Sequence, residues 1–252
     1  MGAHPLSFVG APSSGGVGDS AVSLGRVRDV VFSLLDKDGH PVGCGFFVTP
    51  CGLALTVNHG VSTWSTDGKV SACKLHCSSS SSSLTEVDLS FSVVSTDADL
   101  DFTVLRLEGP LSLDSISHFP LPVATLADDV MWGKPATLVH GNLALNLQFH
   151  QRPEASVVTC NISTVHSHLL LYTAATYVGD SGGALLLMDG QLVGMHKEGM
   201  NDVVEEAASP TTGRKKRRYK TLSEAASIST SAAALRLDCE AVRAAVTSAK
   251  RV

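Results

Sequence analysis

The sequence predicts an all-β protein, a barrel or a sandwich, with one helix at its end. Short apolar stretches rich in β-branched residues recur throughout the chain and are separated by turn residues. Such stretches lie at 27–36, 41–50, 53–59, 89–94, 102–107, 128–141, 143–151, 154–163 and 168–176. Only 231–250 differs, because its apolar residues follow three- and four-residue steps, which predicts an amphipathic helix.

The composition favours a globular protein. Of the 252 residues, 44% are hydrophobic and 17% are charged, enough for one barrel-type domain or two small ones. The first twenty residues have neither a basic start nor an apolar core, so we expect no signal peptide. No apolar run approaches twenty residues, so we expect no membrane-spanning segment. Together with the lack of a signal peptide, this leads us to expect an intracellular protein, cytoplasmic or nuclear.

The chain divides into four parts. Residues 1–24 are rich in Gly, Ser and Pro and predict a flexible N-terminal arm. The proline-rich segment 110–122 reads as a connector, so we place one β unit at 25–112 and a second at 113–230. Residues 231–252 form the C-terminal helix, and the six serines at 78–83 predict a flexible surface loop within the first unit.

The six cysteines predict neither a disulfide framework nor a metal site. Without a secretory signal, free thiols are expected, although the pairing of Cys44 with Cys51 stays open. Cys73, His76 and Cys77 resemble half of a zinc site, but no second ligand pair lies at suitable spacing. We therefore expect no metal, and no motif calls for an organic cofactor.

The stretch 176–199 carries the first chemical signal. In Gly-Asp-Ser-Gly-Gly at 179–183, Ser181 lies between glycines, ahead of an apolar run and an Asp-Gly turn. The glycines permit a tight loop in which the N–H groups of Gly179 and Ser181 point at one spot. Two donors beside a hydroxyl suit the developing oxyanion of acyl transfer, although a plain Gly-Ser turn explains the pentapeptide equally well.

A serine nucleophile also needs a base and a group that orients the base. His59 is the leading base because it closes an apolar stretch that reads as a strand. Asp101 is the leading orienter because it directly precedes the apolar strand 102–107, with Asp97 and Asp99 as local competitors. Each residue alone has an ordinary structural explanation, but the three together indicate a catalytic triad.

In this order, the three motifs resemble the chymotrypsin-like (trypsin-like, PA clan) serine proteases. Residues 43–61 resemble the histidine motif as written in HtrA-type proteases, 99–107 the aspartate strand, and 179–199 the nucleophile hairpin with its specificity strand. The resemblance covers roughly residues 27–230. It implies two six-stranded antiparallel β-barrels, with His59 as general base, Asp101 as orienter, Ser181 as nucleophile, and an oxyanion hole from Gly179 and Ser181.

The resemblance extends to substrate preference. His196, within Gly-x-His-x-x-Gly, resembles the specificity strand of glutamyl endopeptidases and of viral chymotrypsin-fold proteases, which cut after Glu or Gln. Those proteins place a threonine five residues before the nucleophile, where this chain has Thr176. Ala175 and Gly199 are the further pocket residues, and an alanine at the pocket base argues against a basic substrate residue. An imidazole and a hydroxyl can both hydrogen-bond a carboxylate or carboxamide.

A basic run interrupts the second unit at 201–221. Residues Arg214–Lys220 hold six of the chain's 19 basic residues on an otherwise acidic chain. Such a run suits a nuclear import receptor, an anionic surface or no partner at all. No aromatic platform accompanies it, so nucleic acid is not the expected partner.

The sequence therefore predicts a serine endopeptidase that acts on proteins or peptides. The alternative is a catalytically silent protease-fold module that uses the cleft or the basic run to hold a protein or nucleic-acid partner.

Overall fold

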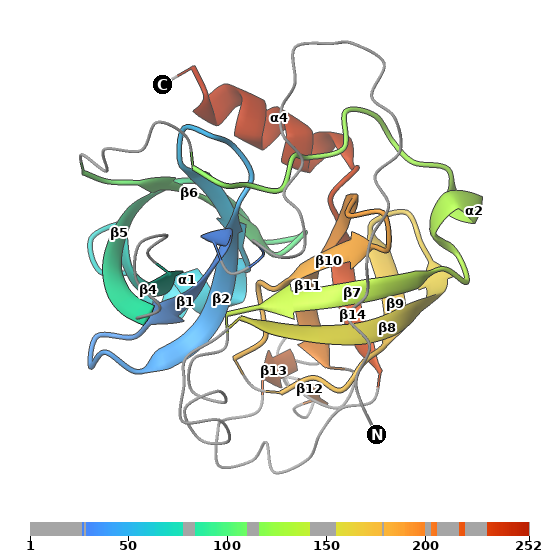
Figure 1. The fold of residues 1–252 in the computed structure, drawn as a ribbon, viewed down its shortest axis with the longest axis horizontal. Helices are drawn as coiled ribbons and strands as arrows, with labels where there is room; N and C mark the ends of the chain where they lie inside the picture. Colours follow the sequence, from blue (N-terminus) through green and yellow to red (C-terminus); the bar gives the residue numbers. More distant parts are fainter. Residues whose placement is uncertain are drawn as a thin grey trace, which may run out of the picture.

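The computed structural model describes residues 27, 29–77, 84–109, 116–141, 155–177, 179–199, 203–205, 217–219 and 231–251. Two closed antiparallel barrels of six strands each stand side by side, and the C-terminal helix lies against the first (Figure 1). The predicted all-β class with two barrels and a C-terminal helix is confirmed. None of the helices in these ranges is long and apolar enough to cross a membrane.

The first barrel has the strand order β1-β2-β3-β6-β5-β4. Its strands are β1 (Val31–Leu35), β2 (Pro41–Phe47), β3 (Leu53–Thr56), β4 (Lys69–Cys77), β5 (Leu84–Asp97) and β6 (Phe102–Leu107). Phe32 stacks on Phe91 at a centroid separation of 4.7 Å and meets Phe47 at 5.3 Å. Successive side chains of a strand point to opposite faces of the sheet, and these rings lie on the face that points into the barrel.

The second barrel has the strand order β10-β11-β14-β9-β8-β7. Its strands are β7 (Pro135–His140), β8 (Ser156–Val165), β9 (Leu169–Thr173), β10 (Ala184–Leu187), β11 (Leu192–Gly199) and β14 (Ala232–Arg236). Every residue of β10 is buried. Leu185 and Leu187 face the barrel interior, whereas Ala184 and Leu186 join the core cluster of the first barrel. The strand after the Gly-Asp-Ser-Gly-Gly loop therefore lies at the junction of the two barrels.

Short elements complete the fold. The helices are α1 (Asn58–Trp64), α2 (Asp128–Met131) and α4 (Glu240–Ala249), and β12 (Val203–Glu205) pairs with β13 (Arg217–Tyr219). The buried face of α4, formed by Val242, Val246 and Ala249, packs on β5 and β6. The chain end therefore returns from the second barrel to the first.

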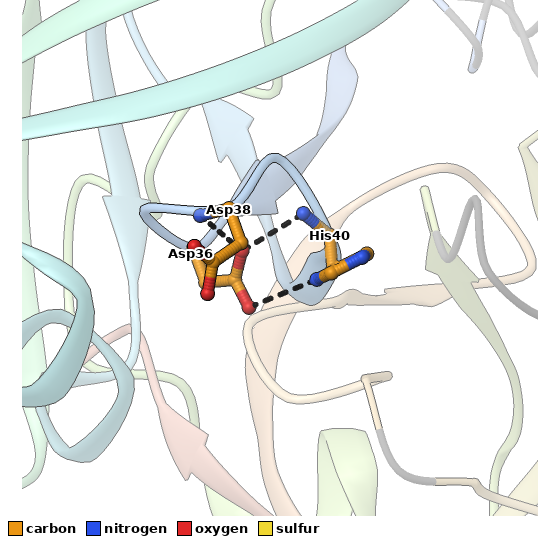
Figure 2. A group of neighbouring side chains, drawn as sticks. All are labelled: Asp36, Asp38 and His40. Atoms are coloured by element: carbon orange, nitrogen blue, oxygen red, sulfur yellow. Dashed lines mark hydrogen bonds and ion pairs between the residues drawn. The ribbon is translucent and has the colours of Figure 1, made fainter.

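The side chains drawn in Figure 2, those of Asp36, Asp38 and His40, lie in the turn between β1 and β2. Oδ1 of Asp36 accepts the backbone N–H groups of Asp38 and His40 at 2.9 and 2.8 Å, and its Oδ2 lies 3.6 Å from Nδ1 of His40. The N–H of His40 is the main reason why the pKa of Asp36 lies below its usual value. Gly39 has a φ of 82°, which this tight turn requires. These side chains thus hold a hairpin.

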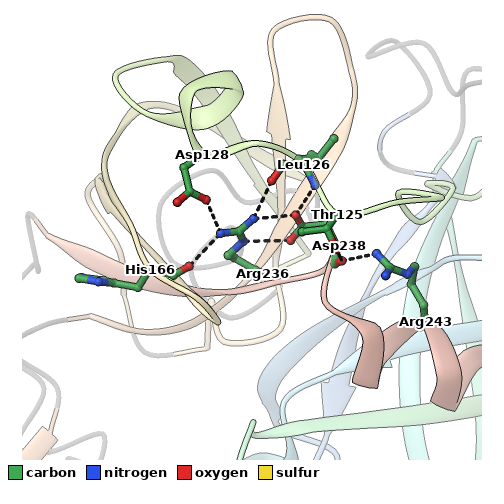
Figure 3. Close-up of polar contacts among 7 residues, drawn as sticks. All are labelled: Thr125, Leu126, Asp128, His166, Arg236, Asp238 and Arg243. Carbon is green, nitrogen blue, oxygen red and sulfur yellow. Dashed lines mark hydrogen bonds and ion pairs between the residues drawn. The ribbon is translucent and has the colours of Figure 1, made fainter.

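A buried guanidinium fixes the entry and exit of the second barrel (Figure 3). Arg236 is 4% exposed and donates to both carboxylate oxygens of Asp238 at 3.0 and 2.8 Å. It also donates to Asp128 and to the backbone carbonyls of His166 and Leu126, so all five of its N–H groups are used. The connector before α2 is thereby tied to the end of β14.

The structure corrects three expectations about elements. The segment expected as a helix at 231–250 divides into β14 and α4, because β14 pairs with both β11 and β9 to close the second barrel. The stretch expected as a strand at 128–141 begins with the helical turn α2. His59, expected at a strand end, lies in the first turn of α1.

Five of the described cysteines form no disulfide bond, namely Cys44, Cys51, Cys73, Cys160 and Cys239. The open pairing of Cys44 with Cys51 is therefore absent. The half zinc site lies on β4, where the side chains of His76 and Cys77 are outside the described residues. The arm 1–24, the serines 78–83, the strand expected at 143–151 and most of Arg214–Lys220 also lie outside them, so those expectations stay predictions.

Candidate active site

His59 and Asp101 are joined by two hydrogen bonds. Oδ2 of Asp101 lies 2.9 Å from Nδ1 of the His59 ring, and Oδ1 accepts the His59 backbone N–H at 2.8 Å. A carboxylate only accepts, so Nδ1 must carry the proton and the acceptor lone pair is on Nε2. The carboxylate thus fixes both the position and the tautomer of the imidazole.

The local backbone explains why Asp101, rather than its neighbours, reaches the histidine. Oδ1 of Asp97 accepts the N–H groups of Asp99 and Leu100 at 3.0 and 2.9 Å and closes the turn. Asp101 follows with a φ of 62°, a left-handed conformation that is rare for residues other than glycine. Of the three candidate acids in this turn, only Asp101 contacts His59.

The pKa of Asp101 lies below its usual value. Burial raises the pKa of this carboxyl, but the hydrogen bonds and charge of His59, together with the charge of Lys197, outweigh that effect. The nearest lysine nitrogen, Nζ of Lys197, lies 3.9 Å from Oδ2. Asp101 is therefore a carboxylate at neutral pH, as an orienting group must be.

Ser181 lies in a loop that is anchored to the first barrel. Gly179 and Gly182 have φ values of 98° and 91°, a backbone conformation that glycine adopts readily in the tight loop that the motif predicts. The N–H of Cys44 donates to the Ser181 carbonyl at 2.8 Å, and the Cys44 thiol donates to the Gly179 carbonyl at 3.0 Å. Burial and the charge of Asp180 raise the pKa of that thiol well above its ordinary value, so the sulfur keeps its proton.

Close packing leaves no room for a side chain at Gly182. A Cβ there would lie 1.9 Å from the Cys44 carbonyl oxygen and 2.8 Å from Oγ1 of Thr56. Thr56 ends β3, directly before the helix that carries His59. The loop of Ser181 and the helix of His59 therefore meet at the same few residues of the first barrel.

The backbone N–H groups of this loop fall into two sets. The N–H groups of Asp180, Gly182 and Gly183 donate to carbonyls within the second barrel. Those of Gly179 and Ser181 donate to no acceptor in the described part of the chain. Donors that stabilise a developing negative charge must not be occupied otherwise, so these two N–H groups stay the candidates for an oxyanion hole.

The Ser181 hydroxyl makes no hydrogen bond to His59 or to any other residue that the structure describes. In hydrolases without substrate, the bond between nucleophile and base is often longer than in the complex. The structure thus brings the two residues to one junction, but it joins only His59 and Asp101 directly.

A buried polar pair lies beneath the serine. Asp180 is fully buried and accepts the N–H of Tyr177 at 2.8 Å. Its Oδ1 lies 3.0 Å from Nδ1 of His140, an ion-pair separation, although the two groups are not aligned for a hydrogen bond. Burial lowers the pKa of His140 despite the nearby carboxylate. The residue beside the nucleophile is thus fixed by contacts that the sequence motif does not reveal.

The four expected pocket residues differ in exposure. His196 and Thr176 are each 1% exposed, and Gly199 is also buried at the end of β11, whereas Ala175 is exposed. The Tyr172 hydroxyl lies 2.7 Å from Nδ1 of His196. Burial, with smaller effects from His140 and His59, lowers the pKa of His196 to about 3, so its ring is neutral at pH 7.

Thr176 has an unusual hydroxyl. Its Oγ1 is buried and has no hydrogen-bond partner among the described residues. Leaving a buried hydroxyl without a hydrogen bond is unfavourable by about 1–3 kcal/mol, so such groups are uncommon unless a bound molecule supplies the missing hydrogen bond. The hydroxyl is available to a bound group in the way that a pocket residue requires.

Several contacts of the site could not be named from sequence. Cys44, Tyr172 and Lys197 each contact a predicted site residue, and His140 contacts Asp180, yet the sequence assigned no role to any of the four. Only Lys197 left a sequence signal, since it directly follows His196 in the expected specificity strand.

Comparison with known proteins agrees with this geometry. The family model described as "Trypsin-like peptidase domain" matches residues 43–195. No curated protein matches the chain by sequence comparison. The solved structures that it resembles include a Glu endopeptidase in complex with MPD, with a TM-score of 0.61 and 17% identity over 92% of this chain and 96% of that one.

Two further solved structures share the fold. The MamO protease domain from Magnetospirillum magneticum gives a TM-score of 0.51 and 20% identity over 76% of this chain and 90% of that one. An inactive serine-to-alanine mutant of Rv3671c from M. tuberculosis H37Rv gives 0.53 and 13%, over 91% of each chain. At these identities, the likeness shows the fold alone.

Proposed function

Because the chain belongs to the family of trypsin-like peptidase domains, we propose that it is a serine endopeptidase with Ser181, His59 and Asp101 as its triad. The family match covers the His59 motif, Asp101 and Ser181. The observation that carries the proposal is the pair of hydrogen bonds from Asp101 to His59, because they hold the imidazole in the tautomer that a general base needs.

Each group has a defined role in the proposed reaction. Nε2 of His59 takes the proton from the Ser181 hydroxyl as its oxygen attacks the scissile carbonyl. The carboxylate of Asp101 stabilises the resulting imidazolium, and the N–H groups of Gly179 and Ser181 stabilise the oxyanion. His59 then gives its proton to the leaving amine. Water, activated by the same base, releases the acyl group and restores Ser181.

We further propose cleavage after Gln or Glu. The unpaired Thr176 hydroxyl and the neutral imidazole of His196 can each hydrogen-bond a side-chain carbonyl oxygen. The resemblance in fold to a Glu endopeptidase agrees with this preference. Both groups are uncharged, and burying a carboxylate without a positive partner is costly. Gln should therefore be preferred over Glu at neutral pH.

Profiling cleavage sites in a peptide mixture tests activity and preference together. We expect cuts after Gln, fewer after Glu, and none with the Ser181→Ala variant. Thr176→Val, which replaces the hydroxyl by a methyl group at nearly constant volume, should weaken the preference for Gln while cleavage continues. Cuts after Arg, Lys or Phe would refute the pocket assignment, and cuts that persist in Ser181→Ala would refute the triad.

A further inference from the structure

Lys197 lies in an unusual place for a lysine. Its side chain is 14% exposed, and its Nζ is 3.9 Å from Oδ2 of Asp101, whose own side chain is 11% exposed. Lysine is rarely so buried unless its charge is paired. Among the described residues, Lys197 and His59 are the basic side chains with a nitrogen atom within 4.0 Å of this carboxylate.

The backbone explains how the lysine reaches Asp101. His196 pairs with Ala234 and Glu198 with Ala233, so the register between β11 and β14 shifts at Lys197. One extra residue opposite an unbroken partner strand is a β-bulge, which turns a side chain away from its regular direction. Bulges are frequent beside active sites. Here the bulge sends Lys197 toward the first barrel.

Oδ2 of Asp101 is shared between two groups. It lies 2.9 Å from Nδ1 of His59 and 3.9 Å from Nζ of Lys197. The ammonium nitrogen is thus within 6.8 Å of the ring nitrogen, the sum of those two separations. A carboxylate that already faces one cation attracts a second one less, and the two cations repel each other.

We propose that Lys197 is a positioning residue of the triad, whose ammonium group holds Oδ2 of Asp101 and competes with the His59 ring for that oxygen. This inference rests on the proposed function. It makes the charge of Lys197, rather than its volume, the property that matters.

Four other titratable residues lie on β11 and in the turn before Asp101. On β11 these are His196, which is neutral at pH 7, and Glu198, the residue that follows the bulge. In the turn before Asp101 they are Asp97, whose Oδ1 is used by backbone N–H groups, and the exposed Asp99. Lys197 contributes the positive charge of this group.

The test is the pH dependence of labelling by a fluorophosphonate. For Lys197→Met, the midpoint of the acidic limb should move to higher pH by about 0.5–1 unit, the effect of one charge at this range in a partly hydrated site. Lys197→Arg keeps the charge and should keep the midpoint. Lys250→Met, which removes an exposed lysine on the helix end, serves as the matched control.

The outcomes separate this inference from the proposed function. Labelled variants whose midpoints agree within about 0.2 unit would overturn the role of Lys197 while leaving the triad intact. Wild-type protein that is never labelled would refute the proposed function. NMR titration of the His59 ring would then still decide the role of Lys197, because the same displacement is expected without catalysis. If Lys197→Met does not fold, Lys197→Gln removes the charge and retains a polar end group.

Discussion

Replacing Arg236 by Met should destabilise the protein strongly. The guanidinium is 4% exposed and is the cationic partner of Asp238, which is fully buried. Met fills a similar length but leaves that carboxylate without its bidentate partner, and also leaves the carbonyls of Leu126 and His166 unpaired. Breaking a buried ion pair from one side costs about 3–5 kcal/mol. The contact to Asp128 adds little, because that side chain is 67% exposed.

Urea and thermal unfolding measure this effect. A loss of 3–5 kcal/mol corresponds to a fall in Tm of about 6–20 °C for a chain of this size. Adding Asp238→Asn removes the uncompensated charge and should recover about half of the loss, whereas Arg251→Met, at an exposed site, should stay within about 0.5 kcal/mol. A loss below about 1 kcal/mol for Arg236→Met, with the fold intact, would refute the reasoning.

Two further predictions concern the nucleophile loop and the buried histidines. Gly182→Ala places a Cβ 1.9 Å from the Cys44 carbonyl oxygen, so it should abolish labelling by a fluorophosphonate and lower the free energy of unfolding in urea by about 3 kcal/mol. Gly190 has a similar φ of 88° but open space around it. Gly190→Ala should therefore cost about 1 kcal/mol and leave labelling intact. Equal effects of the two changes would contradict the packing argument. Burial lowers the pKa of His196 to about 3 and also lowers that of His140, so the unfolded chain binds more protons below the ordinary histidine value of 6.5. The stability that these two neutral histidines contribute should therefore be fully present above pH 6.5. The free energy of unfolding should fall toward acidic pH by up to about 1.4 kcal/mol per pH unit for each histidine. A free energy of unfolding that is constant from about pH 6.5 to 5 would contradict this.

The sequence was most informative where chemistry depends on motifs. The pentapeptide predicts a tight loop, in which Gly179 and Gly182 adopt positive φ values, and Asp101 reaches His59 as expected. The choice of Asp101 over Asp97 followed from its place before a buried strand. The structure adds the physical reason, since Asp97 uses its carboxylate to close the turn.

Tertiary pairing overrode local preference elsewhere. The alanine-rich start of 231–250 favours a helix, but these residues close the second barrel as β14 by pairing with two strands. His59 belongs to an apolar run that reads as a strand. Its helix α1 instead packs Trp64 over Gly60 and Gly43, where an added Cβ would lie 2.1 and 2.9 Å from the ring. Such contacts join distant segments and leave no periodic signal.

Supporting residues of the site were missed for the same reason. The Tyr172 hydroxyl reaches His196 across two strands, and His140 reaches Asp180 from another strand. Lys197 reaches Asp101 only because a bulge redirects it, and a bulge cannot be placed without the register of both strands.

The central claim is that Ser181 is a nucleophile activated by His59. Intact-mass and peptide-mapping analysis after fluorophosphonate treatment tests it most directly. The account predicts one adduct on Ser181 in the wild type, none in Ser181→Ala, and labelling slowed by several orders of magnitude in Asp101→Asn, where the imidazole loses its oriented tautomer. A folded wild-type protein that takes up no label would contradict it, and would favour a silent module that binds its partner in the same cleft.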